Sequence, residues 1–404
     1  MLTGESIVCF APDPWGDIWR NRHRLLSVFS RRNKVLYVEP RLGVRGLLRK
    51  LRSGAVKPRH FFRKRTTEVR ENIFVYHDPV HLPRTAWRGI GPAVDRRRDT
   101  MLLAATRRLS IANPILWLVR PDTWDVPGKL QEKVVMYQMV DDYLSYAGLT
   151  ERARARIQEE ERRLASRADI LIVTSEYLLE VKRHLGDHII LVRNGVDERT
   201  LEEGLRGECD CPEELRAAPR PIYGYIGGVT EKLDMDLLEK VAVEAARKLG
   251  GTLVFVGTLS ATEPNVVSHI QRLRALPQVL FLGQRDVSLI PAYLRAFDVC
   301  LVPYKIGSQA KAIDPLKLYE YLAFGKPIVS VDIPSVRRYA HVLKIGRTHE
   351  EFVRLLGEAA LEKDQNLAEE RRAIARENTW EARAEQISAA VEEALRRKSQ
   401  VLAR

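Results

Sequence analysis

The chain has 404 residues, of which 45% are hydrophobic, so it can form about two domains with apolar cores. Its net charge of +13 at pH 7 favours anionic partners. No apolar run approaches the ~18–20 residues of a membrane-spanning helix. The first run, Ile7–Ala11, lacks the basic segment of a signal peptide. Cys9 and Cys300 lie in apolar runs, which indicates a reduced, cytoplasmic protein, and Cys209-Asp-Cys211 has no second pair to complete a metal site.

Short apolar runs predict the strands. In the first half they are Ile7–Ala11, Val35–Val38, Ile73–Tyr76, Ile115–Val119, Val134–Val140, Ile170–Thr174 and Ile189–Val192. In the second half they are Ile222–Ile226, Leu253–Gly257, Val279–Leu282, Val299–Val302 and Ile328–Val331. Amphipathic segments between them predict helices, for example Glu151–Ser166, Asp236–Leu249, Leu289–Ala296 and Glu351–Leu361. This alternation predicts an α/β fold of two Rossmann-like domains with parallel sheets and a cleft between them.

The domain boundary is expected near the segment RNGVDERT, Arg193–Thr200, which reads as a hinge. The first domain is then residues 1–196 and the second residues 197–377. The remaining residues, 378–404, form an amphipathic tail with Trp380 as its expected anchor.

The segment Arg41–Arg65 contains ten Lys/Arg residues and no acidic residue. Leucines and valines alternate with these cations, and Phe61-Phe62 follow. The pattern predicts a basic amphipathic surface that meets anionic lipid. A solvated arm is the plain alternative, and nucleic acid is not expected, because no nucleic-acid motif accompanies the charge.

The stretch AIDPLKLYEYLAFGKPIVS, residues 312–330, places a lysine where helix chemistry disfavours it. Asp314 and Pro315 predict a helix start, and Gly325 predicts its end. Lys317 then lies in the first turn, where the helix dipole is positive. An anion bound at this helix start would make the lysine favourable.

Glycines and polar loops follow four consecutive predicted strands of the second half, where α/β domains bind ligands. They are GGVTEKLDMDLL, Gly257-Thr258, LGQRD and VPYKIGSQAKAIDP. Paired glycines let the backbone approach a ligand, and a helix start favours phosphate. Glu320, three residues after Lys317, can accept hydrogen bonds from a ribose. The two residues can also be a surface pair worth only ~0.3 kcal/mol, but the loops favour a nucleotide.

The segments DPLKLYEYLAFGKPIVS, YIGGVTEKLDMDLL and FLGQRDVSLIPAYLRAFDVCLVPY resemble GT-B-fold glycosyltransferases. The likeness is to bacterial transferases of the teichuronic acid biosynthesis type and, more loosely, to the xanthan-type glucuronosyltransferase. DPWGDIWRNRHRL and VMYQMVDDYLSY also fit this group. The resemblance implies an N-terminal acceptor domain, a C-terminal domain for a nucleotide-sugar, usually a UDP-sugar, and a tail helix that crosses back to the first domain.

The resemblance also implies roles for the donor-side residues. Lys317 would contact the diphosphate with Leu318 beside it, Glu320 would contact the ribose, and the remaining donor residues would be Gly227, Gly228, Gly283, Gln284, Arg285 and Tyr304. No metal or cofactor would be needed, since the nucleotide-sugar is a co-substrate and Lys317, the helix dipole and loop amides neutralise the leaving diphosphate. Many retaining members carry a Glu eight residues before the ribose-binding one. Ala312 occupies that position here, so the anomeric outcome stays open.

An inverting enzyme needs a base for the acceptor hydroxyl. Asp141 and Asp142 follow the predicted strand Val134–Val140 and are the first candidates, because adjacent carboxylates can raise one another's pKa. They can equally cap the helix that follows.

Asp13 and Asp17, after the first strand, are further candidates, and His23 is a weaker one. Trp15 and Trp19 beside them can stack on an acceptor sugar or simply pack the loop.

The sequence therefore predicts a glycosyltransferase acting on a lipid-linked or polymeric acceptor, peripheral on the inner face of the cell membrane. A sugar-nucleotide epimerase of the same fold and a non-catalytic protein that binds nucleotide or anionic polymer are the alternatives.

Overall fold

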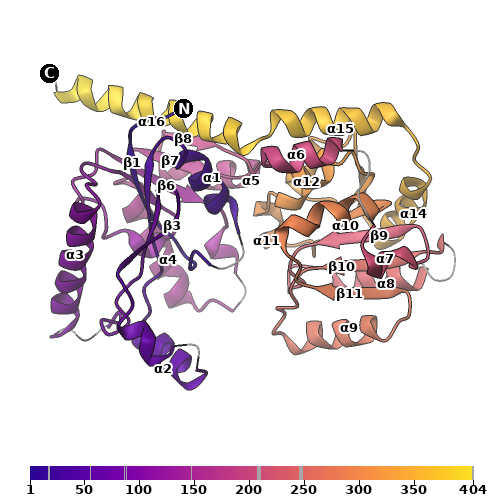
Figure 1. Ribbon diagram of the computed structural model, residues 1–404, viewed down its shortest axis with the longest axis horizontal. Helices are drawn as coiled ribbons and strands as arrows, with labels where there is room; N and C mark the ends of the chain where they lie inside the picture. Colours follow the sequence, from indigo (N-terminus) through magenta and orange to yellow (C-terminus); the bar gives the residue numbers. More distant parts are fainter. Residues whose placement is uncertain are drawn as a thin grey trace. The chain divides into compact units, whose positions relative to one another are not determined.

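The computed structural model describes residues 1–16, 19–54, 56–85, 87, 89–146, 148–206, 211–244 and 249–402. The chain forms two compact units. The first consists of Met1–Val173, Leu179–Val192 and Ala384–Arg404, and the second of Thr174–Leu178 and Arg193–Arg383. Each unit is an α/β structure built on its own sheet (Figure 1).

The described part of the first unit contains an eight-stranded sheet in the order β3-β4-β2-β1-β5-β6-β7-β8. Its pairs are parallel except β3 with β4. The strands are β1 (Ser6–Phe10), β2 (Lys34–Val38), β3 (Thr66–Arg70), β4 (Ile73–Tyr76), β5 (Ile115–Leu118), β6 (Val134–Met139), β7 (Ile170–Val173) and β8 (Ile189–Leu191). The central strands are apolar on both faces and fully buried, as parallel sheets require.

The helices between these strands include α1 (Asn21–Phe29), α2 (Val44–Arg52), α3 (Gly91–Arg108) and α4 (Glu151–Ala165), which lie in the first unit. The helix α5 (Glu176–Lys182) begins in the second unit and continues into the first. None of the helices in the described part of the chain is long and apolar enough to cross a membrane.

The second unit contains a parallel sheet in the order β11-β10-β9-β12-β13-β14. The strands are β9 (Ile222–Ile226), β10 (Thr252–Val256), β11 (Val279–Gly283), β12 (Val299–Val302), β13 (Ile328–Val331) and β14 (Lys344–Gly346). The strand order reverses between β9 and β12, so this is the switch point of the sheet.

Helices cover both faces of the second sheet. α8 (Met235–Glu244) packs against α9 (Pro264–Arg274) and α14 (His349–Ala360), while α12 (Leu316–Ala323) packs against α6 (Glu198–Leu205) and α15 (Gln365–Glu377). The shorter helices are α7 (Glu213–Arg216), α10 (Ile290–Ala296), α11 (Ser308–Ala312) and α13 (Pro334–Arg337).

The last helix, α16 (Trp380–Leu402), begins in the second unit and continues into the first. Trp380 is buried at its start, and its N–H donates to the carbonyl of Val196 at 3.0 Å. Further along, the Ser388 hydroxyl accepts from the Leu2 N–H at 3.0 Å and Lys398 pairs with Asp169 at 2.6 Å. The tail helix therefore joins the two units, as the GT-B fold requires.

All the predicted strands are present within about one residue of their expected bounds. Two strands were not predicted. β3 is mostly exposed at the sheet edge, and β14 has three residues, so neither carries a continuous apolar run. The predicted helix Asp236–Leu249 is present as α8 up to Glu244, and residues 245–248 lie outside the described residues.

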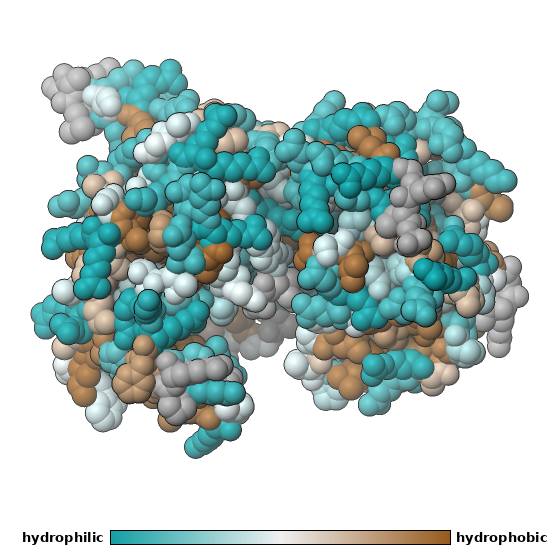
Figure 2. Space-filling model, in the orientation of Figure 1, coloured by the Kyte–Doolittle hydropathy of each residue, from teal (hydrophilic) through white to brown (hydrophobic). Residues whose placement is uncertain are grey.

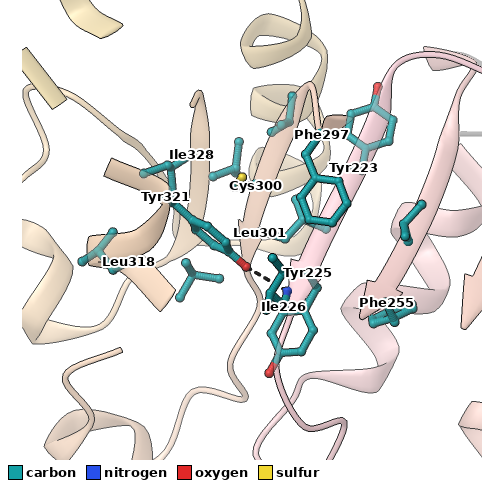
Figure 3. Close-up of a cluster of buried hydrophobic side chains, with 14 of the residues drawn as sticks. Tyr223, Tyr225, Ile226, Phe255, Phe297, Cys300, Leu301, Leu318, Tyr321 and Ile328 are labelled. Carbon is teal, nitrogen blue, oxygen red and sulfur yellow. Dashed lines mark hydrogen bonds between the residues drawn. The ribbon is translucent and has the colours of Figure 1, made fainter. Parts of the chain in front are cut away.

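The core of the second unit depends on close packing at Gly224, in the middle of β9. A Cβ atom at this position would lie 2.0 Å from the ring of Phe297, whose side chain is fully buried. Figure 3 shows Phe297 against Tyr223 and Leu301 in this core. Only glycine fits here, because the buried ring has no space into which to retreat.

We expect Gly224→Ala to lower the free energy of unfolding by about 1–3 kcal/mol through overpacking. Phe297→Leu in the same chain should restore part of the loss by making room for the new methyl group. A double-mutant cycle read by thermal unfolding measures this coupling. Strictly additive losses would contradict the packing explanation.

Candidate active site

The candidate donor site lies at the switch point of the second sheet, where β9 and β12 end. Gly227 follows β9 and Tyr304 follows β12. The loop after β12 leads into α11 and α12, so the first turn of α12 is placed at the same sheet edge. Ligands of α/β sheets bind at this position.

Lys317 lies in the first turn of α12, as predicted. Its ammonium donates to the hydroxyls of Tyr225 at 3.1 Å and Tyr304 at 2.9 Å. It also lies over the two rings, 4.5 and 4.9 Å from their centroids, in cation–π geometry. A lysine has three N–H donors. Among the described residues no carboxylate pairs with this partly buried cation.

The protonation of Lys317 is maintained by the two tyrosines. Burial alone would lower the pKa of the ammonium. Tyr225 and Tyr304 raise this pKa by more than burial lowers it, so it lies above its usual value. The Tyr225 hydroxyl in turn donates to the carbonyl of Gly228 at 3.1 Å. Lys317 is therefore a fixed cation at neutral pH.

The glycines at the strand ends allow the loops to approach one another closely. Gly227 has φ +135° and Gly257 has φ +151°, and a Cβ on Gly257 would lie 2.1 Å from the carbonyl oxygen of Gly227. The Gly227 N–H donates to Val256 at 2.9 Å, and the Gly257 N–H donates to Gly283 at 2.9 Å. A Cβ on Gly227 would also lie 3.2 Å from the Lys317 ammonium nitrogen. Side chains are thus excluded from the space in front of the lysine.

Thr258 has a buried hydroxyl for which the described residues supply no hydrogen-bond partner. It lies beside Gly228, since a Cβ on that glycine would be 3.5 Å from the Thr258 oxygen and 3.7 Å from that of Ser260. A buried polar atom without a partner is costly, and a bound ligand can supply the missing hydrogen bond. Thr258 therefore belongs to the candidate site together with Lys317.

The remaining predicted donor residues are placed as follows. Glu320 is partly buried on α12, one turn after Lys317, and Gln284 is exposed. The Arg285 side chain is turned to Tyr293 at 2.9 Å and Glu214 at 2.7 Å, so only its backbone can border a base. Leu318 is fully buried in the apolar core (Figure 3), which leaves its side chain only a packing role.

The predicted cap of α12 by Asp314 is wrong. The N-cap residue is Pro315 without a side-chain cap, and Asp314 is buried instead. Its carboxylate accepts from the Asn194 N–H at 2.6 Å and from the Tyr319 hydroxyl at 3.1 Å. Burial raises the pKa of Asp314 to about 6. These bonds fix the start of α12, and thereby Lys317, to the segment that enters the second unit.

The predicted acceptor-side tryptophans form an aromatic cluster in the first unit. Trp15 is buried, with its ring 5.7 Å from Trp19, 5.1 Å from His23 and 5.1 Å from Tyr37. Trp19 has the Arg70 guanidinium 4.4 Å from its ring centroid. The structure favours the packing alternative for both rings.

His23 is fully buried in this cluster. Its Nδ1 accepts from the Arg20 N–H at 3.1 Å, so a neutral ring carries its proton on Nε2, which lies 3.2 Å from the Tyr37 hydroxyl. That hydroxyl donates to the Asp13 carbonyl at 2.8 Å. Because both ring nitrogens are engaged, His23 is a structural residue in this arrangement.

The predicted carboxylates differ in their surroundings. Asp13 forms ion pairs with Arg22 and with Arg20, and Asp17 lies outside the described residues. Asp142 pairs at 3.1 Å with the buried Lys182, which also pairs with Glu161 at 2.9 Å. Asp142 makes no side-chain cap, so the cap alternative is wrong for it.

Asp141, next to Asp142 at the end of β6, is partly buried. It accepts a hydrogen bond from Tyr146. Burial and the Asp141 charge raise the pKa of that phenol above its usual value, so Tyr146 is a stable donor at neutral pH.

Sequence reasoning missed Tyr225 as a site residue because it lies within an apolar strand. A signal was present, since a buried tyrosine usually has a hydrogen-bond partner for its hydroxyl. The partner, Lys317, is 92 positions away in the chain, so only the fold could identify it.

The chain matches the family described as Glycosyl transferases group 1 over residues 220–357. It is 31% identical over 246 residues to the putative teichuronic acid biosynthesis glycosyltransferase TuaH of Bacillus subtilis (strain 168). That alignment covers 57% of this chain and 59% of the relative, so the chain spans about three fifths of the length of the relative that it matches.

Solved structures share the fold of the whole chain. Sucrose-phosphate synthase from Thermosynechococcus elongatus superposes with a TM-score of 0.66 at 14% identity, covering 96% of this chain and 98% of that one. The UDP-forming trehalose-phosphate synthase from Burkholderia xenovorans gives 0.67 at 11%, covering 96% and 100%. HepE from Anabaena, in complex with UDP, gives 0.62 at 13%, covering 96% and 100%. This chain thus has the GT-B fold, and its residues 220–357 match the group 1 glycosyltransferase family.

Proposed function

We propose that the protein is a glycosyltransferase that moves a sugar from a UDP-sugar to a saccharide acceptor. The observation that carries the proposal is the Lys317 ammonium, held between two tyrosine hydroxyls at a sheet switch point without a carboxylate partner among the described residues. A diphosphate supplies the missing negative charge. The TuaH relative supports a glycosyltransferase, and the HepE structure in complex with UDP supports this class of donor.

On the donor side, the leaving diphosphate would be stabilised by Lys317 and by the loops after β9 and β10. Preorganised donors of this kind act on charge that develops in the transition state. Glu320 would accept from the ribose hydroxyls, and the backbone of residues 283–285 would border the base. The chemistry is proposed to proceed without a metal, because Lys317, the helix dipole and the loop amides can neutralise the leaving diphosphate.

On the acceptor side, the proton of the attacking hydroxyl needs a base if the reaction inverts. Asp142 forms an ion pair with the buried Lys182, which also pairs with Glu161. Asp141, at the same strand end, therefore becomes the first candidate, ahead of Asp13, which pairs with Arg20 and Arg22.

The acceptor is proposed to be lipid-linked or polymeric and to be modified at the inner face of the cell membrane. Two observations support this location: the name of the TuaH relative, a putative teichuronic acid biosynthesis glycosyltransferase, and the exposed basic helix α2. Which sugar is transferred is left to donor screening. Slow hydrolysis of the accepted UDP-sugar would identify a transferase, whereas sugar interconversion without an acceptor would identify an epimerase.

We expect Lys317→Ala to weaken UDP binding by about 1.5–3 kcal/mol, the range for a hydrogen bond to a charged group. Isothermal calorimetry measures this loss. Lys311→Ala is the matched control, because Lys311 is an exposed cation of the same loop region, in α11. Unchanged UDP affinity in the Lys317 variant would disprove the phosphate assignment.

Thr258→Val should lower UDP affinity by about 1 kcal/mol through the loss of one hydrogen bond. Thermal stability should stay equal or rise, because the buried hydroxyl has no partner among the described residues. Thr252→Val is the opposite control, since the Thr252 hydroxyl donates to the Pro219 carbonyl at 2.8 Å. That variant should lose stability and keep UDP affinity, and the same behaviour in Thr258→Val would refute a ligand role.

Asp141→Asn should reduce transfer by about 10²–10⁴-fold, as for a lost general base, with UDP affinity retained. Asp142→Asn should instead lower the free energy of unfolding by about 1.5–3 kcal/mol, because Lys182 loses a charged hydrogen bond. Transfer rates and melting temperatures of the two variants separate these effects. A near-wild-type rate for Asp141→Asn would move the search to Asp13 and Asp17.

A further inference from the structure

The first unit exposes an apolar face on α2. Val44, Leu48 and Leu51 are exposed at 40%, 50% and 40%. Their spacing of four and three residues places them on one side of the helix. No residue of α2 is buried, so this face has no partner among the described residues.

A second segment, residues 84–95, is bonded at both ends to the residues at the start of α2. Arg84 donates its N–H to Leu42 at 2.8 Å and accepts from the Val44 N–H at 3.2 Å. Asp95 of α3 pairs with Arg41 at 2.6 Å. Both ends of the stretch 84–95 are therefore held by residues 41–44.

This fastened stretch adds large apolar side chains to the surface. Trp87 is 73% exposed and Ile90 is 51% exposed. Phe62, which follows α2 in the basic segment, is 88% exposed. We call the six residues the apolar patch; they are Val44, Leu48, Leu51, Phe62, Trp87 and Ile90. Figure 2 shows apolar side chains among hydrophilic ones in the region of α2, where Figure 1 places that helix.

Cations border the apolar patch on its α2 side. Arg45, Arg49 and Arg52 lie on the helical face next to the apolar one, as their spacing shows. The segment 41–65 contains ten Lys/Arg residues and no acidic residue. A helix with an apolar face bordered by cations is typical of proteins that lie in the headgroup region of an anionic bilayer.

We infer that the apolar patch inserts into an anionic lipid bilayer, with Trp87 as its aromatic anchor and the α2 cations on the headgroups. Tryptophan favours the membrane–water interface, where its ring is apolar and its N–H stays hydrated. The inference deepens the proposed function by assigning the membrane-contacting residues. Binding to vesicles requires neither donor nor catalysis, so it can fail or succeed independently of the transferase proposal.

The experiment uses the full chain and vesicles of equal parts phosphatidylcholine and phosphatidylglycerol. Trp87 is the most exposed tryptophan, whereas Trp19 and Trp124 are partly buried and Trp15, Trp117 and Trp380 are buried. Its emission should shift to the blue on vesicle addition and be quenched by spin-labelled lipid. Trp87→Phe should abolish most of the shift while the protein still sediments with vesicles.

Two variants separate the apolar and electrostatic contributions. Trp87→Ala with Ile90→Ala should weaken vesicle binding about tenfold. Gln at Arg45, Arg49, Lys50 and Arg52 should weaken it about a hundredfold or more at low salt. The matched charge control carries Gln at four exposed cations elsewhere, Arg347, Arg354, Arg376 and Arg396, and should bind vesicles as the wild type does.

Circular dichroism and thermal unfolding are measured on every variant and should be unchanged, which shows that the chain is folded. Sedimentation with vesicles without any Trp87 shift would overturn insertion at this patch. Equal weakening by the charge control would show attraction by net charge alone and would also overturn it. Binding to heparin with no binding to vesicles would make an acidic polymer the occupant instead.

Discussion

The structure of the candidate site depends on one ammonium group held where the helix dipole opposes it. Lys317, in the first turn of α12, is kept protonated by the hydroxyls of Tyr225 and Tyr304 and by the faces of their rings. Three other features serve this arrangement. Gly227 leaves room for the lysine, Gly257 lets two strand ends touch, and buried Asp314 fixes the start of the helix. Such a cation is costly without an anion, and this cost is the physical basis of the proposed phosphate contact.

The polar side chains at the strand ends of the two units differ in their partners. In the first unit two candidate carboxylates form ion pairs: Asp13 pairs with Arg22, and Asp142 pairs with Lys182, which also pairs with Glu161. In the second unit the Thr258 hydroxyl and the Lys317 cation are left without such partners among the described residues. Unsatisfied polar groups that converge on one sheet edge distinguish a ligand site from a structural network. The donor side is therefore better defined by the structure than the catalytic base.

The apolar patch lacks an apolar partner among the described residues, whereas the candidate donor site lacks an anion. Here large apolar side chains remain in water, bordered by cations, on a helix that contributes nothing to the core. Isolated exposed apolar residues are common, but a patch made from separate segments that the backbone fastens together is not. The missing anion of the candidate donor site and the missing apolar partner of the patch are both consistent with the proposed enzyme, which binds a soluble nucleotide-sugar and a membrane-bound acceptor.

The sequence by itself determined the fold class, almost every strand and the position of Lys317, because continuous apolar runs and helix-terminal residues act locally. It also identified the glycines at the strand ends and the basic segment 41–65. Only the tertiary structure decided the role of Tyr225, the burial of Asp314 and the commitment of Asp142 to Lys182, since each depends on a partner distant in the chain. The same holds for Trp87, whose place beside α2 follows from the backbone bonds of Arg84 with Leu42 and Val44. Periodicity specifies which residues are buried, whereas the pairing of particular side chains follows only from how the strands and helices pack.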